Sequence, residues 1–154
     1  MICEGRVVES DIKIEEILRE VMKNTAQKGD GALVLFIGYV KGLVEGHKVH
    51  ELRYEAYEPY ASKMLRDIAC SIAKKYSLNY VLVLHRVGIL RPGDPSIYIV
   101  VTANSRHTAY EASREILEQV KSRVPIFKLE KRDDGEYWVV GDGRRIPRRR
   151  RGDD

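Results

Sequence analysis

Three stretches of the chain repeat apolar residues at the 3.6-residue period of an amphipathic helix. The first follows Ser10-Asp11, which supplies a suitable N-cap, and ends before the turn signal at Lys28–Gly31. The second covers Ala61–Tyr76, and the third begins after Asn104-Ser105, where either residue can supply the N-cap. Pro125 disfavours helical geometry at the residue before it, so the third helix is expected to end there.

The remaining apolar segments are short and are bounded by Gly, Pro, Asn or Asp, which is typical of strands. Val49–Tyr57 alternates with period two, and Ala32–Val40 is apolar on both sides, as expected of a central strand that is covered on both faces. We predict strands at Gly5–Val8, Ala32–Val40, Val49–Tyr57, Tyr80–Val87, Ser96–Thr102, Ile126–Glu130 and Tyr137–Val140. The last two should form a hairpin around Asp133-Asp134-Gly135. This order of elements lacks sustained βαβ alternation and predicts an α+β fold.

The charge of the chain is concentrated at one end. The net charge of +4 equals the six arginines less the two aspartates of residues 144–154, so residues 1–143 are electrically balanced. A length of 154 residues is typical of one domain, which we place at 1–143, followed by an Arg-rich tail at 144–154. The tail is interpreted as a solvated or partner-ordered terminus, with contact to nucleic acid as the less favoured interpretation.

Cysteine and histidine spacing gives no sign of a metal centre. Cys3 and Cys70 form no CxxC pair, and the four histidines lack ligand spacing. Cys70 falls on the apolar side of a predicted helix and is expected to be an inert core thiol. The longest apolar run, Ala32–Val40, is about half of what a membrane-spanning helix needs. We therefore expect a cytoplasmic protein without a metal, a cofactor or a membrane contact.

Cations stand on both sides of the break at Pro125. Lys121 is predicted in the last helical turn and Lys128 on the next strand, where Ile126 and Lys128 share a face beside an apolar wall. The simpler interpretation is that Lys121 only complements the helix dipole. Arg106 follows a strand at the start of the third helix, where an anion site and a solvated surface are equally good interpretations.

Three ordered motifs resemble the large, catalytic subunit of molybdopterin synthase, and the resemblance extends from about residue 5 to about residue 140. The motifs are Gly31-Ala32-Leu33-Val34-x-Phe36-x-Gly38, His85-Arg86-Val87-Gly88-x-Leu90-x-Pro92-Gly93-Asp94 and Lys121-x-Arg123-x-Pro125-x-Phe127-Lys128. The resemblance implies an α/β hammerhead fold with an additional antiparallel β-hairpin subdomain. It also implies a homodimer whose subunits each bind one small ubiquitin-like partner that ends in Gly-Gly, giving a heterotetramer.

The reaction implied by the resemblance is a sulfur transfer. The partner's C-terminal glycine carries a thiocarboxylate, and two sulfurs pass in turn to cyclic pyranopterin monophosphate to make the dithiolene of molybdopterin. Lys121 is then the principal catalytic residue, in proton transfer or in stabilising the tetrahedral species at the glycine carbonyl, and Lys128 supports it. The expected substrate-binding residues are Phe36, Lys41, Arg106, His107, Leu117 and Arg123.

Three positions depart from the usual pattern of that family. Ser105-Arg106 replaces a usual His-Arg pair, with a histidine displaced to His107. Lys41 replaces an arginine and loses the bidentate fork for phosphate, and Leu117 replaces a frequent methionine. His85 and Arg86 are expected to hold structure near a turn.

A second hypothesis is a non-catalytic dimeric binding protein that uses its Arg-rich tail for nucleic acid or an acidic partner. The presence of Lys121, Arg123 and Lys128 together favours the enzyme.

Overall fold

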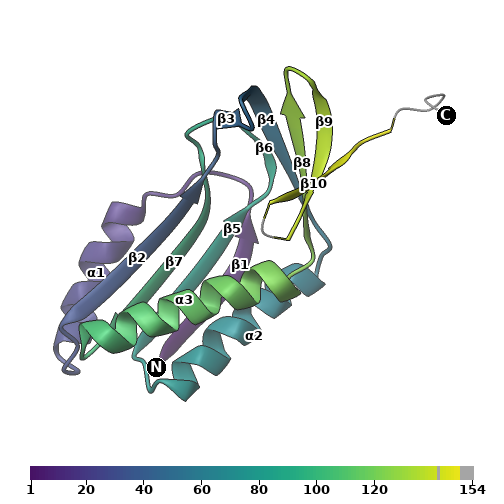
Figure 1. Cartoon of the computed structure of the whole chain (residues 1–154). Helices are drawn as coiled ribbons and strands as arrows, with labels where there is room; N and C mark the ends of the chain where they lie inside the picture. Colours follow the sequence, from purple (N-terminus) through teal and green to yellow (C-terminus); the bar gives the residue numbers. More distant parts are fainter. Residues whose placement is uncertain (142, 150–154) are drawn as a thin grey trace.

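The computed structural model describes residues 1–141 and 143–149 of the chain. Within them, three helices and ten strands form two sheets joined end to end, an α+β fold as predicted (Figure 1). The elements are β1 Ile2–Val8, α1 Ile14–Ala26, β2 Ala32–Tyr39, β3 Leu43–Val44, β4 His47–Ala56, α2 Tyr60–Lys75, β5 Tyr80–Arg86, β6 Gly88–Leu90, β7 Pro95–Ala103, α3 Arg106–Arg123, β8 Ile126–Arg132, β9 Gly135–Val140 and β10 Arg144–Pro147.

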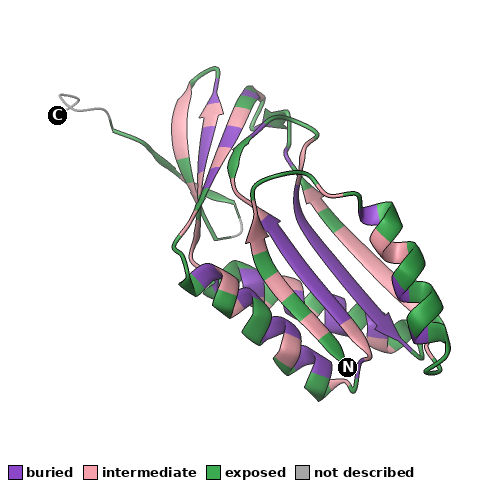
Figure 2. Cartoon of the chain, turned by 180° about the vertical axis from the view of Figure 1, so that it is seen from behind, coloured by how far each residue is buried: buried purple, intermediate pink, exposed green. Residues whose placement is uncertain are grey.

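The first sheet has the strand order β1-β5-β7-β2 and is covered by helices on both faces. Only β1 and β5 run parallel. Alternate residues of β5 explain the two covered faces: Val81 and Val83 pack with α2 and α3, whereas Leu82 and Leu84 pack with α1. The central strands β5 and β7 are buried over almost their whole length (Figure 2). The prediction that Ala32–Val40 is a central strand is wrong, because β2 lies at the edge of the sheet. Its apolar residues are on both sides because the two apolar clusters flank this edge strand, with Val34 in one and Leu33 in the other.

The second sheet has the order β10-β9-β8-β4-β3, and β6 pairs with β4. The predicted hairpin is confirmed: β8 and β9 pair antiparallel, with Arg132 opposite Gly135 at the turn. Gly135 takes a φ of 138°, which a residue with a side chain rarely adopts. A small apolar cluster of Val40, Leu52, Tyr54 and Leu90 fills the junction between the sheets.

The predicted boundaries of the helices hold at α3 and fail at the start of α1. Ser105 Oγ accepts a hydrogen bond from the Thr108 N–H, which confirms the N-cap of α3. Helix α1 begins only at Ile14 and has no side-chain cap, so the predicted cap at Ser10-Asp11 is wrong. The Asp11 carboxylate instead accepts hydrogen bonds from the Ile12 N–H and the Tyr98 hydroxyl.

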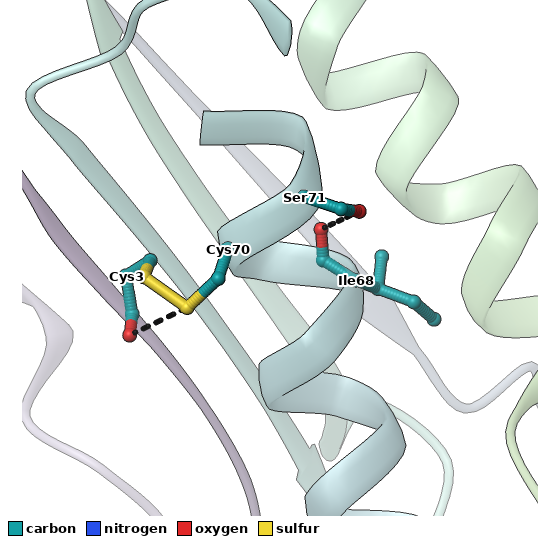
Figure 3. Close-up of a disulfide and its surroundings, with 4 residues drawn as sticks. All are labelled: Cys3, Ile68, Cys70 and Ser71. Carbon is teal, nitrogen blue, oxygen red and sulfur yellow. Dashed lines mark hydrogen bonds between the residues drawn. A yellow bond between two sulfur atoms is a disulfide. The ribbon is translucent and has the colours of Figure 1, made fainter. Parts of the chain in front are cut away.

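The expectation of an inert Cys70 thiol is also wrong, because Cys3 and Cys70 form a disulfide (Figure 3). Their Cα atoms lie 5.0 Å apart where β1 packs against α2. Gly5 permits this close approach, since a Cβ at that position would collide with the backbone of Leu65 and Arg66. Two cysteines 67 residues apart thus meet through the packing of a strand on a helix.

The Arg-rich tail does not begin as a solvated terminus. Arg144–Pro147 forms β10 and pairs antiparallel with β9, so these residues belong to the edge of the second sheet. Residues 150–154 of the tail lie outside the described residues. Short strands at Leu43–Val44 and Gly88–Leu90 likewise replace parts of predicted loops.

Within the described part of the chain, no helix has the length and apolar character needed to cross a membrane.

Replacing Gly5 by Ala should destabilise the fold, because the added methyl group meets the α2 backbone, which cannot move without disturbing the core. We expect a loss of about 2–3 kcal/mol in the free energy of unfolding, seen as a melting temperature lower by about 5–10 °C. Gly31→Ala is the control, since a Cβ added there would meet no atom within 4 Å. Equal melting temperatures for the two variants, followed by circular dichroism, would contradict the close packing.

Candidate functional site

A cavity of about 460 Å³ lies where α3 and the two sheets meet. Its walls come from segments far apart in the sequence, including β2, the loop after it, β4, the end of α3, and β8. We call it the junction cavity. Five of the eight predicted site residues line it: Phe36, Lys41, Leu117, Lys121 and Lys128.

The break at Pro125 brings the two predicted catalytic lysines to this cavity. Helix α3 ends at Arg123, and Val124 is extended with φ −82° and ψ 127°, as the proline predicted. The Tyr57 N–H donates to the Pro125 carbonyl oxygen and ties the new direction of the chain to β4. Lys121 therefore lies in the last turn of α3, and Lys128 reaches the same cavity from β8.

Lys128 is the more deeply placed of the two amines. Its Nζ lies 5.8 Å from the centroid of the Tyr54 ring, close enough for a cation–π contact. Burial lowers the pKa of Lys128 below its ordinary value; the charge of Glu130 opposes this shift, while Arg145, Lys121 and Lys41 add to it. The Lys128 amine therefore loses its proton more easily than the amine of an exposed lysine does.

His85 lines the cavity beside Tyr54, at a ring distance of 5.2 Å. Burial lowers its pKa to about 4, so the imidazole is neutral at pH 7. Its Nδ1 lies 2.8 Å from the Arg86 carbonyl oxygen, which only accepts, so Nδ1 carries the proton and Nε2 is left as an acceptor. This bond next to the β5–β6 connection fits the predicted structural role of His85.

The lining residues that were not predicted as site residues include Tyr54, Glu130 and Arg145. Glu130 could have been found, because it lies two residues after Lys128 on one strand and so shares its face. Tyr54 lies directly opposite Lys128 in the β4–β8 ladder. Arg145 gave no such signal, since its position depends on the register of a strand that was interpreted as a tail.

The other three predicted site residues do not line the junction cavity of this chain. Arg106 and His107 start α3 and lie about 22 Å along the helix from Lys121. His107 is exposed, with Nε2 3.4 Å from a Glu111 carboxylate oxygen. Arg123 donates to Gln119 Oε1 at 2.8 Å, and its other terminal nitrogen lies 3.5 Å from the sulfur of Met64.

His47, Asp133 and Asp134 cluster at the far end of the second sheet. His47 Nδ1 lies 2.9 Å from Asp133 Oδ1, and His47 Nε2 lies 3.4 Å from Asp134 Oδ2. Asp134 is also held by a fork of two hydrogen bonds from Arg132, each 2.8 Å long. These contacts link the β3–β4 and β8–β9 turns, and the arrangement is that of an ion-pair cluster.

Comparison with known proteins agrees with this architecture. The family described as "MoaE protein" matches residues 7–123. The molybdopterin synthase catalytic subunit of Pyrococcus abyssi is 37% identical over 140 residues, which cover 91% of each chain. That of Bacillus subtilis is 37% identical over 133 residues, covering 86% of this chain and 82% of the relative.

Solved structures share the fold. The crystal structure of molybdopterin synthase from Staphylococcus aureus has a TM-score of 0.77 and 33% identity, covering 90% of this chain and 98% of that chain. A complex of subunits 1 and 2 of the molybdopterin-converting factor from Helicobacter pylori contains a chain of the same fold, with a TM-score of 0.68 and 18% identity; the match covers 89% of this chain and 88% of that chain. The protein thus belongs to the MoaE family, as its three sequence motifs predicted.

Proposed function

We propose that the chain is the catalytic subunit of molybdopterin synthase. It would transfer sulfur from the thiocarboxylated C-terminal glycine of a small ubiquitin-like subunit to cyclic pyranopterin monophosphate, forming the dithiolene. The observation that carries the proposal is the meeting of Lys121 and Lys128 in one cavity, in a chain of this family. The reaction class is therefore that of a sulfurtransferase.

The charge of the cavity suits this reaction. Both expected ligands are anionic, since the pterin carries a phosphate and the partner's glycine carries a thiocarboxylate. Lys41, Lys121, Lys128 and Arg145 line the cavity, against one carboxylate from Glu130. Cations fixed by the fold stabilise bound anions, and also any oxyanion that develops, without reorganising during the reaction.

The two lysines have complementary places in the proposed mechanism. After sulfur has bonded to the pterin, water must add to the glycine carbonyl before the carbon–sulfur bond breaks and a carboxylate is released. Lys121, at the end of α3, is assigned to the tetrahedral species or to proton transfer at this step. Lys128 supports it, and its lowered pKa makes proton exchange at that amine easier.

Arg106 and His107 fit the proposed site only through a second copy of the chain. They lie at the opposite end of α3 from the junction cavity, so they cannot contact a substrate bound beside Lys121 of the same chain. We infer a homodimer in which each subunit supplies these residues to the cavity of the other. Arg123 faces away from the cavity and is better assigned to holding α3 against α2 through Met64.

The small partner is proposed from the family and from the Helicobacter pylori structure, in which subunits 1 and 2 form a complex. A cytoplasmic location also stays a prediction. The Cys3–Cys70 disulfide is a feature of oxidising compartments or of the cytoplasm of hyperthermophiles, so it restricts a cytoplasmic source to the second class.

The binding-protein hypothesis has less support than the enzyme. It needs a tail free to contact nucleic acid or an acidic partner, yet Arg144–Pro147 pairs with β9 and Arg145 turns into the junction cavity.

Lys121→Ala should reduce turnover by about 10²–10⁴-fold, because the reaction loses a proton donor or an oxyanion partner. The assay combines the protein with a thiocarboxylated Gly-Gly partner and cyclic pyranopterin monophosphate, and reads the dithiolene after oxidation to a fluorescent product. Lys23→Ala is the matched control, since Lys23 also lies in the last turn of a helix, α1. Near-normal turnover by a folded, partner-bound Lys121→Ala would refute the assignment.

Shared sites in a homodimer can be tested by mixing two inactive variants. Lys121→Ala and Arg106→Ala homodimers should each be inactive, whereas an exchanged equal mixture should recover about a quarter of wild-type activity. Half of the random dimers are mixed, and each mixed dimer has one intact site of two. Activity no greater than that of the separate variants, despite subunit exchange shown by mass spectrometry, would exclude shared sites.

A further inference from the structure

Strand β10 carries a cation to the junction cavity from a tail that the family motifs do not cover. In the second sheet, Tyr54 lies opposite Lys128, Lys128 opposite Val139, and Val139 opposite Arg145. Residues directly opposite one another in a ladder point to the same face. These four residues therefore form one row on the cavity side, with only the small Val139 between Lys128 and Arg145.

The partner of Arg145 in this row is a buried carboxylate. Arg145 Nε and Nη2 donate to the two oxygens of Glu130, at 2.9 and 3.1 Å, and Nη1 donates to the Gly143 carbonyl oxygen at 2.7 Å. Glu130 is only 2% exposed. A second cation, Arg132, lies farther from Glu130, with Nη1 3.7 Å from Oε1. Its Nε is already paired with Asp134 Oδ1 at 2.8 Å.

Glu130 has a competing cation if Arg145 is removed. Lys128 lies two residues away on the same strand and the same face, and it lines the same cavity. A buried carboxylate that loses its fork needs another cation, since an unpaired buried charge is strongly unfavourable. Arg132 already donates to Asp134 and Glu45 through all three guanidinium nitrogens, so Lys128 is the cation that can move to Glu130. The bidentate fork of Arg145 therefore decides which cation Glu130 holds.

We propose that Arg145 is a positioning residue of the site: it holds Glu130 in a buried fork and thereby keeps the Lys128 amine available to anionic ligands in the junction cavity. The consequence for catalysis rests on the proposed function, whereas the competition between Arg145 and Lys128 for Glu130 does not.

The charges around Lys128 agree with this arrangement. Glu130 on β8 raises the pKa of Lys128, whereas Arg145 on β10, Lys121 on α3 and Lys41 after β2 lower it. The other neighbours are the ring of Tyr54 on β4 and the neutral His85 on β5. Loss of Arg145 removes a positive charge that lowers the pKa of Lys128. It also frees the carboxylate of Glu130, which raises that pKa. Both changes favour a protonated Lys128 that is paired with Glu130.

The test uses full-length Arg145→Gln, Glu130→Gln and the double variant, with Arg144→Gln as the matched control. Arg144 is exposed and lies on the opposite face of β10. The pKa of Lys128 is read by NMR of ¹³C-dimethylated lysines, with its signal identified from Lys128→Arg. Turnover against pH is measured in the reconstituted reaction.

We expect Arg145→Gln to raise the Lys128 pKa by about one unit and to lower turnover about tenfold, with the alkaline part of its pH profile shifted in the same direction. The double variant should restore both, because no carboxylate remains to capture the amine. The Arg144→Gln control should match the wild type. If Arg145→Gln does not fold, Arg145→Lys, which keeps the charge but loses the fork, should give a smaller shift in the same direction.

Two results would overturn the proposal. The first is an unchanged Lys128 titration in folded Arg145 variants. The second is a double variant that titrates normally yet stays as slow as Arg145→Gln, because Arg145 would then act on the substrate directly. Wild-type protein without turnover would refute the proposed function alone, since the titration of Lys128 can still be measured.

Discussion

The chain direction imposed at Pro125 is the constraint on which the junction cavity depends. Helix α3 packs on the first sheet through Ala109, Ala112 and Ile116, whereas β8 belongs to the second sheet. Without a sharp change from helix to strand at Pro125, the continuous segment of α3 and β8 could not pack on the first sheet and also pair in the second. The Tyr57 N–H bond to the Pro125 carbonyl oxygen fixes that change against β4, and the two lysines flanking it reach one cavity as a result.

Much of the fold could be predicted from the sequence, because the period of apolar residues indicates which faces of an element are buried, and a proline indicates where a helix must end. Asn104-Ser105 predicted the start of α3, and Pro125 predicted its end. The apolar run Ala32–Val40 predicted a strand covered on both faces, but it did not show that this strand lies at the edge of the sheet, because helices cover the edge strand as well. The side of α3 on which the Arg123 side chain lies could also have been predicted. At 100° per residue it points about 200° away from Lys121 around the helix, so the two cannot face one cavity.

The missed features depend on contacts between elements that are distant in the sequence. The Cys3–Cys70 disulfide follows from β1 lying against α2, an approach that needs the absence of a side chain at Gly5. Arg145 enters the cavity through the registers of two successive strand pairs, and neither register is encoded in the composition of an arginine-rich segment. Composition instead indicated a solvated tail, and tertiary pairing overrode that indication.

The junction cavity gathers four cations from four separate segments around one buried carboxylate. Like charges brought together from water repel one another, and burial disfavours the charged form of the Lys128 amine. Glu130 offsets part of this cost, but a free carboxylate beside Lys128 would also neutralise the charge that an anionic ligand needs. A bidentate arginine reconciles the two requirements, since it occupies both oxygens of Glu130 and has no accessible neutral form. A lysine at that position would offer a single point charge and leave one carboxylate oxygen open to Lys128. The chemistry of a guanidinium thus explains why an arginine, placed by a strand outside the family motifs, completes the wall of the cavity.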